Sequence, residues 1–172
     1  DPLDDARSDQ GRGRPGEPAQ QRRQDEQAEA DYEHPPPPEQ VGRAARNFEF
    51  FAEAASTMKG ETYSGLKGYL TYVTREPKGV GALIAPWNAP IALASMRVAT
   101  CIAFGNTCVL KPSEYTPLAV TRMVELCHEA GLPPGVVNVV NGRGAVTGTA
   151  LVASPMIDMV GSAQQRKFGQ DK

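Results

Sequence analysis

The side chains best suited to chemistry lie in three short segments, each of which follows a run of apolar residues. The first segment is Pro86-Trp87-Asn88. Its neutral amide could donate a hydrogen bond to an oxygen that gains negative charge during a reaction. The same asparagine could instead close a turn, and the residue type by itself leaves both interpretations open.

The second segment, Lys111-Pro112-Ser113-Glu114, places an ammonium group and a carboxylate three residues apart. Such a pair could bind the hydroxyls of a ribose, with the carboxylate accepting a hydrogen bond from both. A solvated loop would carry the same residues equally well. The spacing therefore indicates a candidate sugar-binding pair beside a plain surface loop.

The third segment contains Gly142, Gly144 and Gly148. Glycines let the backbone approach a ligand closely, and the helix that we expect to begin here has an N-terminus that favours phosphate. The spacing differs from the GxGxxG pattern of dinucleotide-binding proteins, so this motif is a weak indicator when taken alone.

Histidines and cysteines do not predict a metal site. His34 and His128 have no metal-ligating partner at a useful spacing. The cysteines Cys101, Cys108 and Cys127 fall within apolar elements, where packing is the expected role. An odd number of cysteines without a CxxC pair is typical of reduced thiols in a cytoplasmic protein.

Short apolar strands alternate with helices and must position these three segments. We expect strands at 80–85, 107–110, 136–140 and 156–160, and helices at 41–58, 90–104, 116–130 and 144–153, with Thr116 capping the third helix. A further strand is expected at 69–75. The alternation predicts an α/β fold: an incomplete, parallel, doubly wound (Rossmann-like) sheet with helices on both faces. Ligands bind beyond the carboxyl ends of such strands, which is where all three segments lie.

Composition divides the 172 residues near residue 40. Residues 1–40 have a net charge of −6 and a single large aliphatic side chain, Leu3, so we predict a disordered tail. Residues 41–161 are expected to form the domain and 162–172 an unstructured end. The domain side of the chain carries a charge of +4 without a Lys/Arg cluster, which argues against nucleic acid as a partner.

We expect neither a membrane segment nor a signal peptide in this sequence. The longest charge-free run, 79–96, includes Pro86, Asn88 and Pro90, which are unfavourable inside lipid. The first residues are acidic and have no apolar stretch. We therefore expect a cytoplasmic protein that does not bind membranes.

Taken together, the motifs resemble the coenzyme-binding part of the aldehyde dehydrogenase superfamily. The resemblance runs from about residue 46 to 161 and is carried by GVGALIAPWNAPIALASMRVATCIAFGNTCVLKPSEYTPLAV and EAGLPPGVVNVVNGRG. The order and spacing of PWN, KPSE, EAGLPPGVVNVV and GRG all match. At a finer level, NAP and KPSEYTP resemble the branch that oxidises 5-carboxymethyl-2-hydroxymuconate semialdehyde and related substrates.

This resemblance implies a catalytic role for Asn88, as the side-chain donor of an oxyanion hole that stabilises a tetrahedral thiohemiacetal. It also implies coenzyme-binding roles. Lys111 and Glu114 would hold the adenosine ribose, and the negative charge would favour NAD over NADP. The other implied coenzyme-binding residues are Ile84, Ala85, Pro86 and Trp87 on the nicotinamide side, Ser113 in the KPSE segment, and Gly144 and Gly148 near the adenine and pyrophosphate.

The family further implies a small-molecule aldehyde substrate and a homo-oligomer, with residues 69–77 in the oligomerisation hairpin. Two departures stand out. The family's Phe-Thr-Gly-Ser segment is replaced by Ser162-Ala163-Gln164-Gln165, and its general-base Glu and nucleophilic Cys would lie beyond Lys172.

We therefore expect the coenzyme-binding fragment of an NAD-dependent oxidoreductase that converts aldehydes to carboxylic acids, inactive by itself. Two alternatives stay open. One is a non-catalytic nucleotide-binding module, and the other is an interaction protein whose Pro/Gln-rich tail binds a partner.

Overall fold

The computed structural model describes residues 37–65 and 67–162. Most of the expected tail (1–40) and of the expected unstructured end (162–172) therefore lies outside the described residues. The first described element, helix α2 (Pro38–Thr57), begins three residues before the predicted domain boundary at residue 41. Pro38 occupies the first turn, where the missing N–H of proline costs no helical hydrogen bond.

Four parallel strands form the main sheet, in the order β5-β4-β3-β6. They are β3 (Val80–Ile84), β4 (Thr107–Lys111), β5 (Val137–Val139) and β6 (Met159–Ser162). The two central strands are the most buried, as expected for apolar strands covered on both faces. The predicted parallel α/β fold is confirmed.

The last strand lies further along the chain than the sequence pattern indicates. Its predicted bounds were 156–160, whereas pairing with β3 begins when the Asp158 N–H donates to the Val80 carbonyl. Before that point the chain turns, and the Ile157 N–H donates to the Ser154 carbonyl. Met156 is consequently 78% exposed, so the apolar residues at 156–157 belong to the turn and not to the strand.

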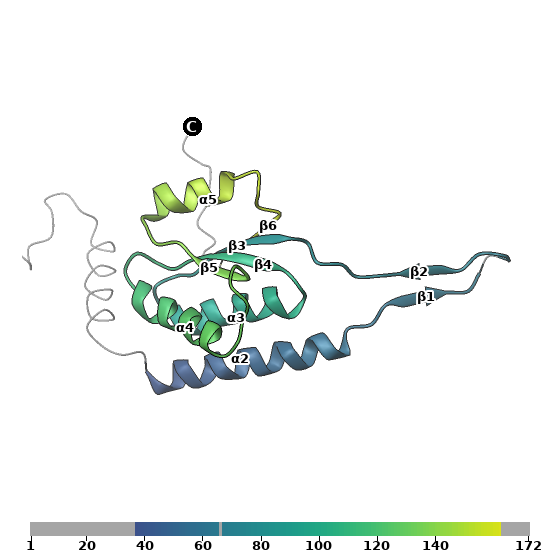
Figure 1. Cartoon of the computed structure of the whole chain (residues 1–172), viewed down its shortest axis with the longest axis horizontal. Helices are drawn as coiled ribbons and strands as arrows, with labels where there is room; N and C mark the ends of the chain where they lie inside the picture. The colour runs from purple at the N-terminus through teal and green to yellow at the C-terminus, as the bar shows by residue number, and fades with distance from the viewer. Residues whose placement is uncertain (1–36, 66, 163–172) are drawn as a thin grey trace, which may run out of the picture.

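Helices cover both faces of the sheet, as predicted. In Figure 1, α3 (Pro90–Ala103), α4 (Pro117–Glu129) and α2 lie on one side, and α5 (Thr149–Ala153) lies on the other. A π-helical turn, η1 (Gly144–Gly148), leads directly into α5. This π-turn was not predicted, because its apolar spacing over five residues cannot be distinguished from that of an α-helix.

The core lies between the sheet and the central helix α3. Its fully buried side chains include Val98, Cys108, Leu110, Val120 and Val137. Apolar residues occur nearly all round α3, and the helix is correspondingly buried on most of its surface. Among the described residues, no helix is long and apolar enough to cross a membrane.

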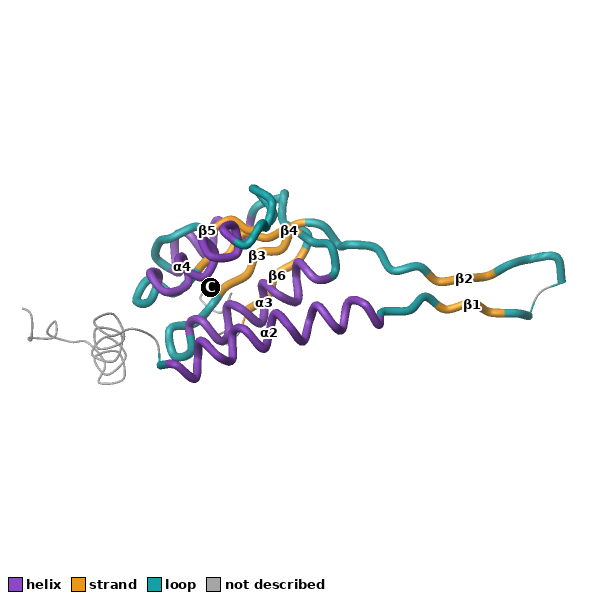
Figure 2. Tube along the Cα trace, turned by 60° about the horizontal axis from the view of Figure 1, so that its bottom comes forward, coloured by secondary structure: helices purple, strands orange, loops and turns teal. Residues whose placement is uncertain are grey.

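A two-stranded antiparallel hairpin projects away from the body of the molecule (Figure 2). It consists of β1 (Glu61–Tyr63) and β2 (Thr71–Val73), and every residue of both strands is exposed. The predicted strand at 69–75 is therefore confirmed only in its middle. Among the described residues of this hairpin, the exposed large apolar side chains are Tyr63, Tyr69, Leu70, Tyr72 and Val73.

Candidate functional site

The segments predicted to carry chemistry follow adjacent strands of the sheet. Ile84, the last residue of β3, pairs with Lys111, the last residue of β4. Beyond that pair, the Ala85 N–H donates to the Lys111 carbonyl at 3.0 Å. The Val140 N–H donates to the Leu110 carbonyl at 3.0 Å, which aligns the end of β5 as well. All three segments therefore leave the same edge of the sheet.

Asn88 lies in the bend between β3 and α3 with its side chain exposed. Pro86 is buried and Trp87 is half-buried, so the bend is anchored while the amide faces outward. Among the described residues, the Asn88 amide has no hydrogen-bond partner. The turn is thus formed without the Asn88 side chain, which leaves its N–H groups available to another molecule.

The helix that follows Asn88 is fixed by a residue that sequence reasoning missed. Asn47 of α2 donates from Nδ2 to the Ala92 carbonyl and to Ser95 Oγ, both at 2.9 Å. Ser95 is fully buried and donates to the Ala92 carbonyl at 3.0 Å. Figure 2 shows α2 and α3 running side by side. One signal in the sequence could have indicated this role, because Asn47 is a single amide within a helical stripe of apolar residues.

Lys111 is a buried cation at the end of β4. The residue is 3% exposed, and its Nζ donates to the Pro112 carbonyl at 3.0 Å. Burial lowers the pKa of the Lys111 ammonium group, and the charge of Glu114 opposes that shift by raising the pKa. Among the described residues, Lys111 forms no ion pair within salt-bridge distance.

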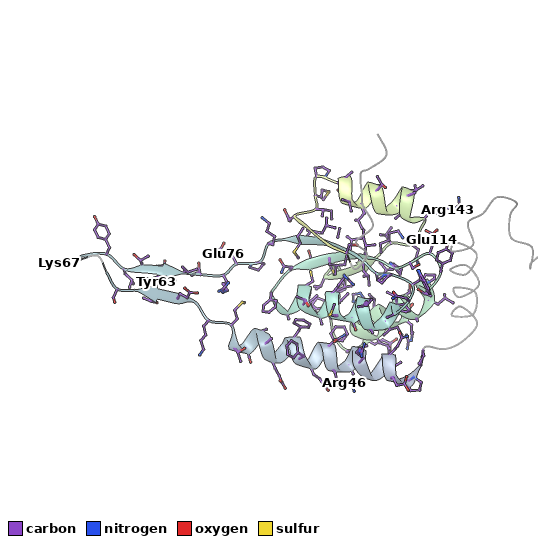
Figure 3. The ribbon with its side chains drawn as sticks, turned by 180° about the vertical axis from the view of Figure 1, so that it is seen from behind. Arg46, Tyr63, Lys67, Glu76, Glu114 and Arg143 are labelled. Carbon is purple, nitrogen blue, oxygen red and sulfur yellow. The ribbon has the colours of Figure 1, made fainter. Side chains whose placement is uncertain are left out.

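Glu114 joins two of the predicted segments directly. Its Oε2 accepts a hydrogen bond from the Gly144 N–H at 2.7 Å. Close by, Gly148 packs against Lys111, because a Cβ at residue 148 would lie 3.6 Å from Lys111 Cδ. The structure therefore brings Lys111, Glu114, Gly144 and Gly148 together. Figure 3 shows Glu114 and Arg143 at the end of the molecule away from the hairpin.

Gly142 shapes the loop that enters this cluster. Its φ of +146° lies in a region that other residues rarely adopt, and a Cβ there would overlap the Thr147 hydroxyl. Only glycine fits this position without a shift of the loop. The sequence motif thus contains one glycine required by the backbone, whereas Gly144 has open space around it.

The hydroxyls of Ser113 and Thr116 lie near the site, and within the described residues only that of Ser113 forms a hydrogen bond, to its own turn. Ser113 Oγ accepts the Tyr115 N–H at 3.3 Å, which helps to form the turn before α4. Thr116 occupies the N-cap position of α4, but its hydroxyl makes no hydrogen bond to the helix. The predicted cap by the Thr116 side chain is therefore wrong. The Thr116 N–H instead donates to the Ser113 carbonyl, and this turn fixes the entry to the helix.

The described residues contain no group of three His, Cys, Asp or Glu side chains that could hold a metal ion. Both ring nitrogens of His128 lie within hydrogen-bonding distance of backbone carbonyls, at 3.1 Å from Leu132 and 3.2 Å from Val137. His128 is thus occupied with joining α4 to β5. His34 lies outside the described residues.

Comparison with known proteins gives consistent results in sequence and in structure. The chain is 51% identical to 5-carboxymethyl-2-hydroxymuconate semialdehyde dehydrogenase of Escherichia coli over 112 residues, which is 65% of this chain and 24% of that protein. It is 43% identical to 2-aminomuconic semialdehyde dehydrogenase of Bos taurus over 121 residues, or 70% of this chain and 25% of that protein. This chain therefore spans about a quarter of the length of these relatives.

A solved structure of aldehyde dehydrogenase from Bacillus cereus, determined as an NAD+ complex, superimposes with a TM-score of 0.69. Its sequence is 38% identical, and the match covers 71% of this chain and 25% of that chain. The family match extends over residues 37–170, beyond the stretch of 46–161 on which the resemblance rested. This chain belongs to the aldehyde dehydrogenase family.

Proposed function

We propose that this chain forms the part of an NAD-dependent aldehyde dehydrogenase that binds the adenosine half of the coenzyme and supplies Asn88 as an oxyanion donor. The observation that carries the proposal is the cluster of Lys111, Glu114, Gly144 and Gly148 at the carboxyl edge of the sheet. This edge is where parallel α/β folds bind nucleotides, and family membership supports the same assignment.

The chemistry of the cluster fits a ribose. An ammonium group has three N–H donors, and the buried Lys111 uses one of them on the Pro112 carbonyl. Glu114 accepts the Gly144 N–H through Oε2, which leaves Oε1 as an acceptor. Vicinal ribose hydroxyls both donate and accept hydrogen bonds, so they match one cationic donor beside one anionic acceptor.

The charge of Glu114 supports NAD over NADP. A carboxylate that receives a ribose hydroxyl repels the 2′-phosphate that distinguishes NADP. Arg143 on the neighbouring loop could have neutralised this charge, but within the described residues it forms no ion pair with Glu114. No arginine of the described residues is therefore paired with the Glu114 carboxylate where the 2′ position would lie.

Asn88 and the bend before it would act at the other half of the coenzyme. When bound here, NAD would supply the hydride acceptor for the oxidation of the aldehyde carbon. The Asn88 amide would donate to the aldehyde oxygen as that oxygen gains negative charge. Ile84, Ala85, Pro86 and Trp87 would form the wall beside the nicotinamide and exclude water from it.

None of the three cysteines is placed to act as the nucleophile beside Asn88. Cys101 Sγ donates to the Thr107 carbonyl at 3.5 Å, and Cys108 follows Thr107 in β4. Both thiols therefore lie near the amino end of β4, whereas the candidate site lies at the carboxyl end. The hydrogen bond with Cys108 lowers the pKa of the Cys101 thiol, whereas contact with Cys101 and burial raise the pKa of Cys108, and burial raises that of Cys127. It is therefore the position of Cys101 at the amino end of β4, and not its pKa, that separates this thiol from the candidate site.

We further infer a homo-oligomer, because the described residues of the hairpin expose five large apolar side chains, and such patches mark protein interfaces. The substrate would be a small aldehyde. The cytoplasm is the inferred compartment, because the neighbouring Cys101 and Cys108 are free thiols and not a disulfide.

Calorimetric titration of the 172-residue chain with NAD tests the proposal. We expect Lys111→Met to weaken NAD binding by about tenfold, because a charge-assisted hydrogen bond is lost. The control is Lys67→Met, which removes an exposed lysine on the hairpin and should change nothing. Failure of a folded chain to bind NAD at all would favour the interaction-protein alternative and remove the proposal.

A further inference from the structure

We propose that Glu114 is also a positioning residue, whose carboxylate caps the helical segment 144–153 before any coenzyme binds. This inference rests on the proposed function, since it concerns the same site. It assigns to Glu114 a task within the protein itself, in addition to any contact with a ligand.

The helical segment formed by η1 and α5 lacks a cap from its own sequence. The first N–H groups of a helix have no partner within the helix and need one from elsewhere. Arg143 occupies the N-cap position and contributes no side-chain hydrogen bond. Glu114, thirty residues earlier in the sequence, supplies that acceptor to the Gly144 N–H at 2.7 Å. A negative charge at this end also complements the helix dipole.

Little else holds this segment against the sheet. None of the residues of α5 is buried, and Val146 in η1 is 68% exposed. The only buried residue of η1 is Gly148, which packs on the side chain of Lys111. The end of β4 and the loop that follows it therefore secure the segment at two points: Glu114 binds its first residue, and Lys111 contacts Gly148 one turn later.

The capping contact has a consequence for the ligand. A carboxylate already occupies the N-terminus of η1, so a phosphate placed there would meet a like charge. The neutral ribose and adenine are then the parts of a nucleotide that can approach Gly144, while the phosphates bind elsewhere. This differs from the general expectation that a glycine-rich helix start receives phosphate.

Hydrogen exchange in the coenzyme-free 172-residue chain tests the capping role at a single amide. We expect Glu114→Ala to speed exchange at Gly144 by about tenfold, because the N–H loses its only acceptor among the described residues. Glu114→Gln keeps a side-chain carbonyl of the same reach and should restore most of the protection. Glu76→Ala, which removes an exposed loop carboxylate, is the matched control and should leave Gly144 unchanged.

Two outcomes would overturn the capping role: unchanged Gly144 exchange in Glu114→Ala, or equal acceleration in the Gln and Ala variants. Exchange at Val98 and Leu110 reports whether each variant is folded, because both lie in the core. Glu114→Asp, whose shorter side chain cannot reach Gly144, provides a second variant and should behave as Ala does. The measurement contains no coenzyme, so a failure of NAD to bind would remove the proposed function without deciding the cap.

Discussion

At the scale of single residues, the buried ammonium group of Lys111 should make coenzyme binding depend on pH. Its lowered pKa means that the group loses its proton at a lower pH than an ordinary lysine does. We predict that NAD affinity falls as the pH rises from 8 towards about 10, which is near the ordinary pKa of lysine. Lys111→Met should bind weakly with little dependence on pH, and calorimetric titration at several pH values measures both curves.

The lowered pKa of Lys111 affects folding stability in the direction opposite to its effect on NAD affinity. Because the folded chain holds the Lys111 proton less tightly than the unfolded chain does, the unfolded state binds more protons between the two pKa values. The contribution of Lys111 to the free energy of unfolding therefore rises with pH over that interval. A loss of affinity that ran in parallel with a loss of stability attributable to Lys111 would contradict this interpretation.

Gly142 is the residue whose replacement should damage the loop most directly. Gly142→Ala forces a side chain into a left-handed conformation and against Thr147, so we predict destabilisation of about 1–3 kcal/mol. Gly65→Ala is the control, because nothing lies within 4 Å of a Cβ at that position. Chemical denaturation measures both variants, and equal effects would show that Gly142 is not constrained as described.

At the scale of elements, Asn47 is the main polar link between α2 and α3. Asn47→Ala removes both Nδ2 hydrogen bonds and leaves the fully buried Ser95 with fewer partners. We predict a loss of about 1–3 kcal/mol in the free energy of unfolding. Asn138→Ala loses only an exposed hydrogen bond to Gly135 and should cost less than about 1 kcal/mol.

Thermal and chemical unfolding of the two asparagine variants shows whether the Asn47 hydrogen bonds contribute to the stability of the α2–α3 contact. Ala44 is the only buried residue of α2 and Phe48 packs partly buried against the core, so apolar packing and the Asn47 hydrogen bonds both hold this helix. If Asn47→Ala were no less stable than Asn138→Ala, α2 would be held by packing alone.

The element pattern was largely predictable because each central strand is a short apolar run that ends at a polar or turn-forming residue. β3 and β4 were predicted within one residue at each end for this reason. The last strand was misplaced because Met156 and Ile157 are apolar but lie in a turn set by backbone hydrogen bonds. Local sequence does not encode which apolar residues find a strand partner.

The site was only partly predictable for a similar physical reason. The residues of the KPSE and glycine segments could be identified by type, and their shared edge followed from the parallel topology. The bond between Glu114 and Gly144 spans thirty residues, and the contacts of Asn47 span 45 and 48. Pairings at that separation depend on the assembled fold, so residue types alone cannot specify them.

At the scale of the whole molecule, the positions of the cysteines lead to a prediction about activity. The 172-residue polypeptide by itself should not form NADH from aldehydes, because none of its thiols lies beside Asn88. Catalysis through a covalent intermediate is lost by many orders of magnitude without its nucleophile. Absorbance assays with several aldehydes measure this, and NADH formation that thiol alkylation abolishes would refute the prediction.

The central claim is that the adenosine half of the coenzyme binds at the carboxyl edge of the sheet. Mapping where ADP-ribose binds tests this claim most directly. Backbone amide signals of the isotope-labelled 172-residue chain report binding residue by residue. We predict that added ADP-ribose shifts the signals of 111–114 and 142–148 and leaves those of the hairpin, 61–73, unchanged. Shifts confined to the hairpin, or no shifts in a folded chain at millimolar ADP-ribose, would contradict the account.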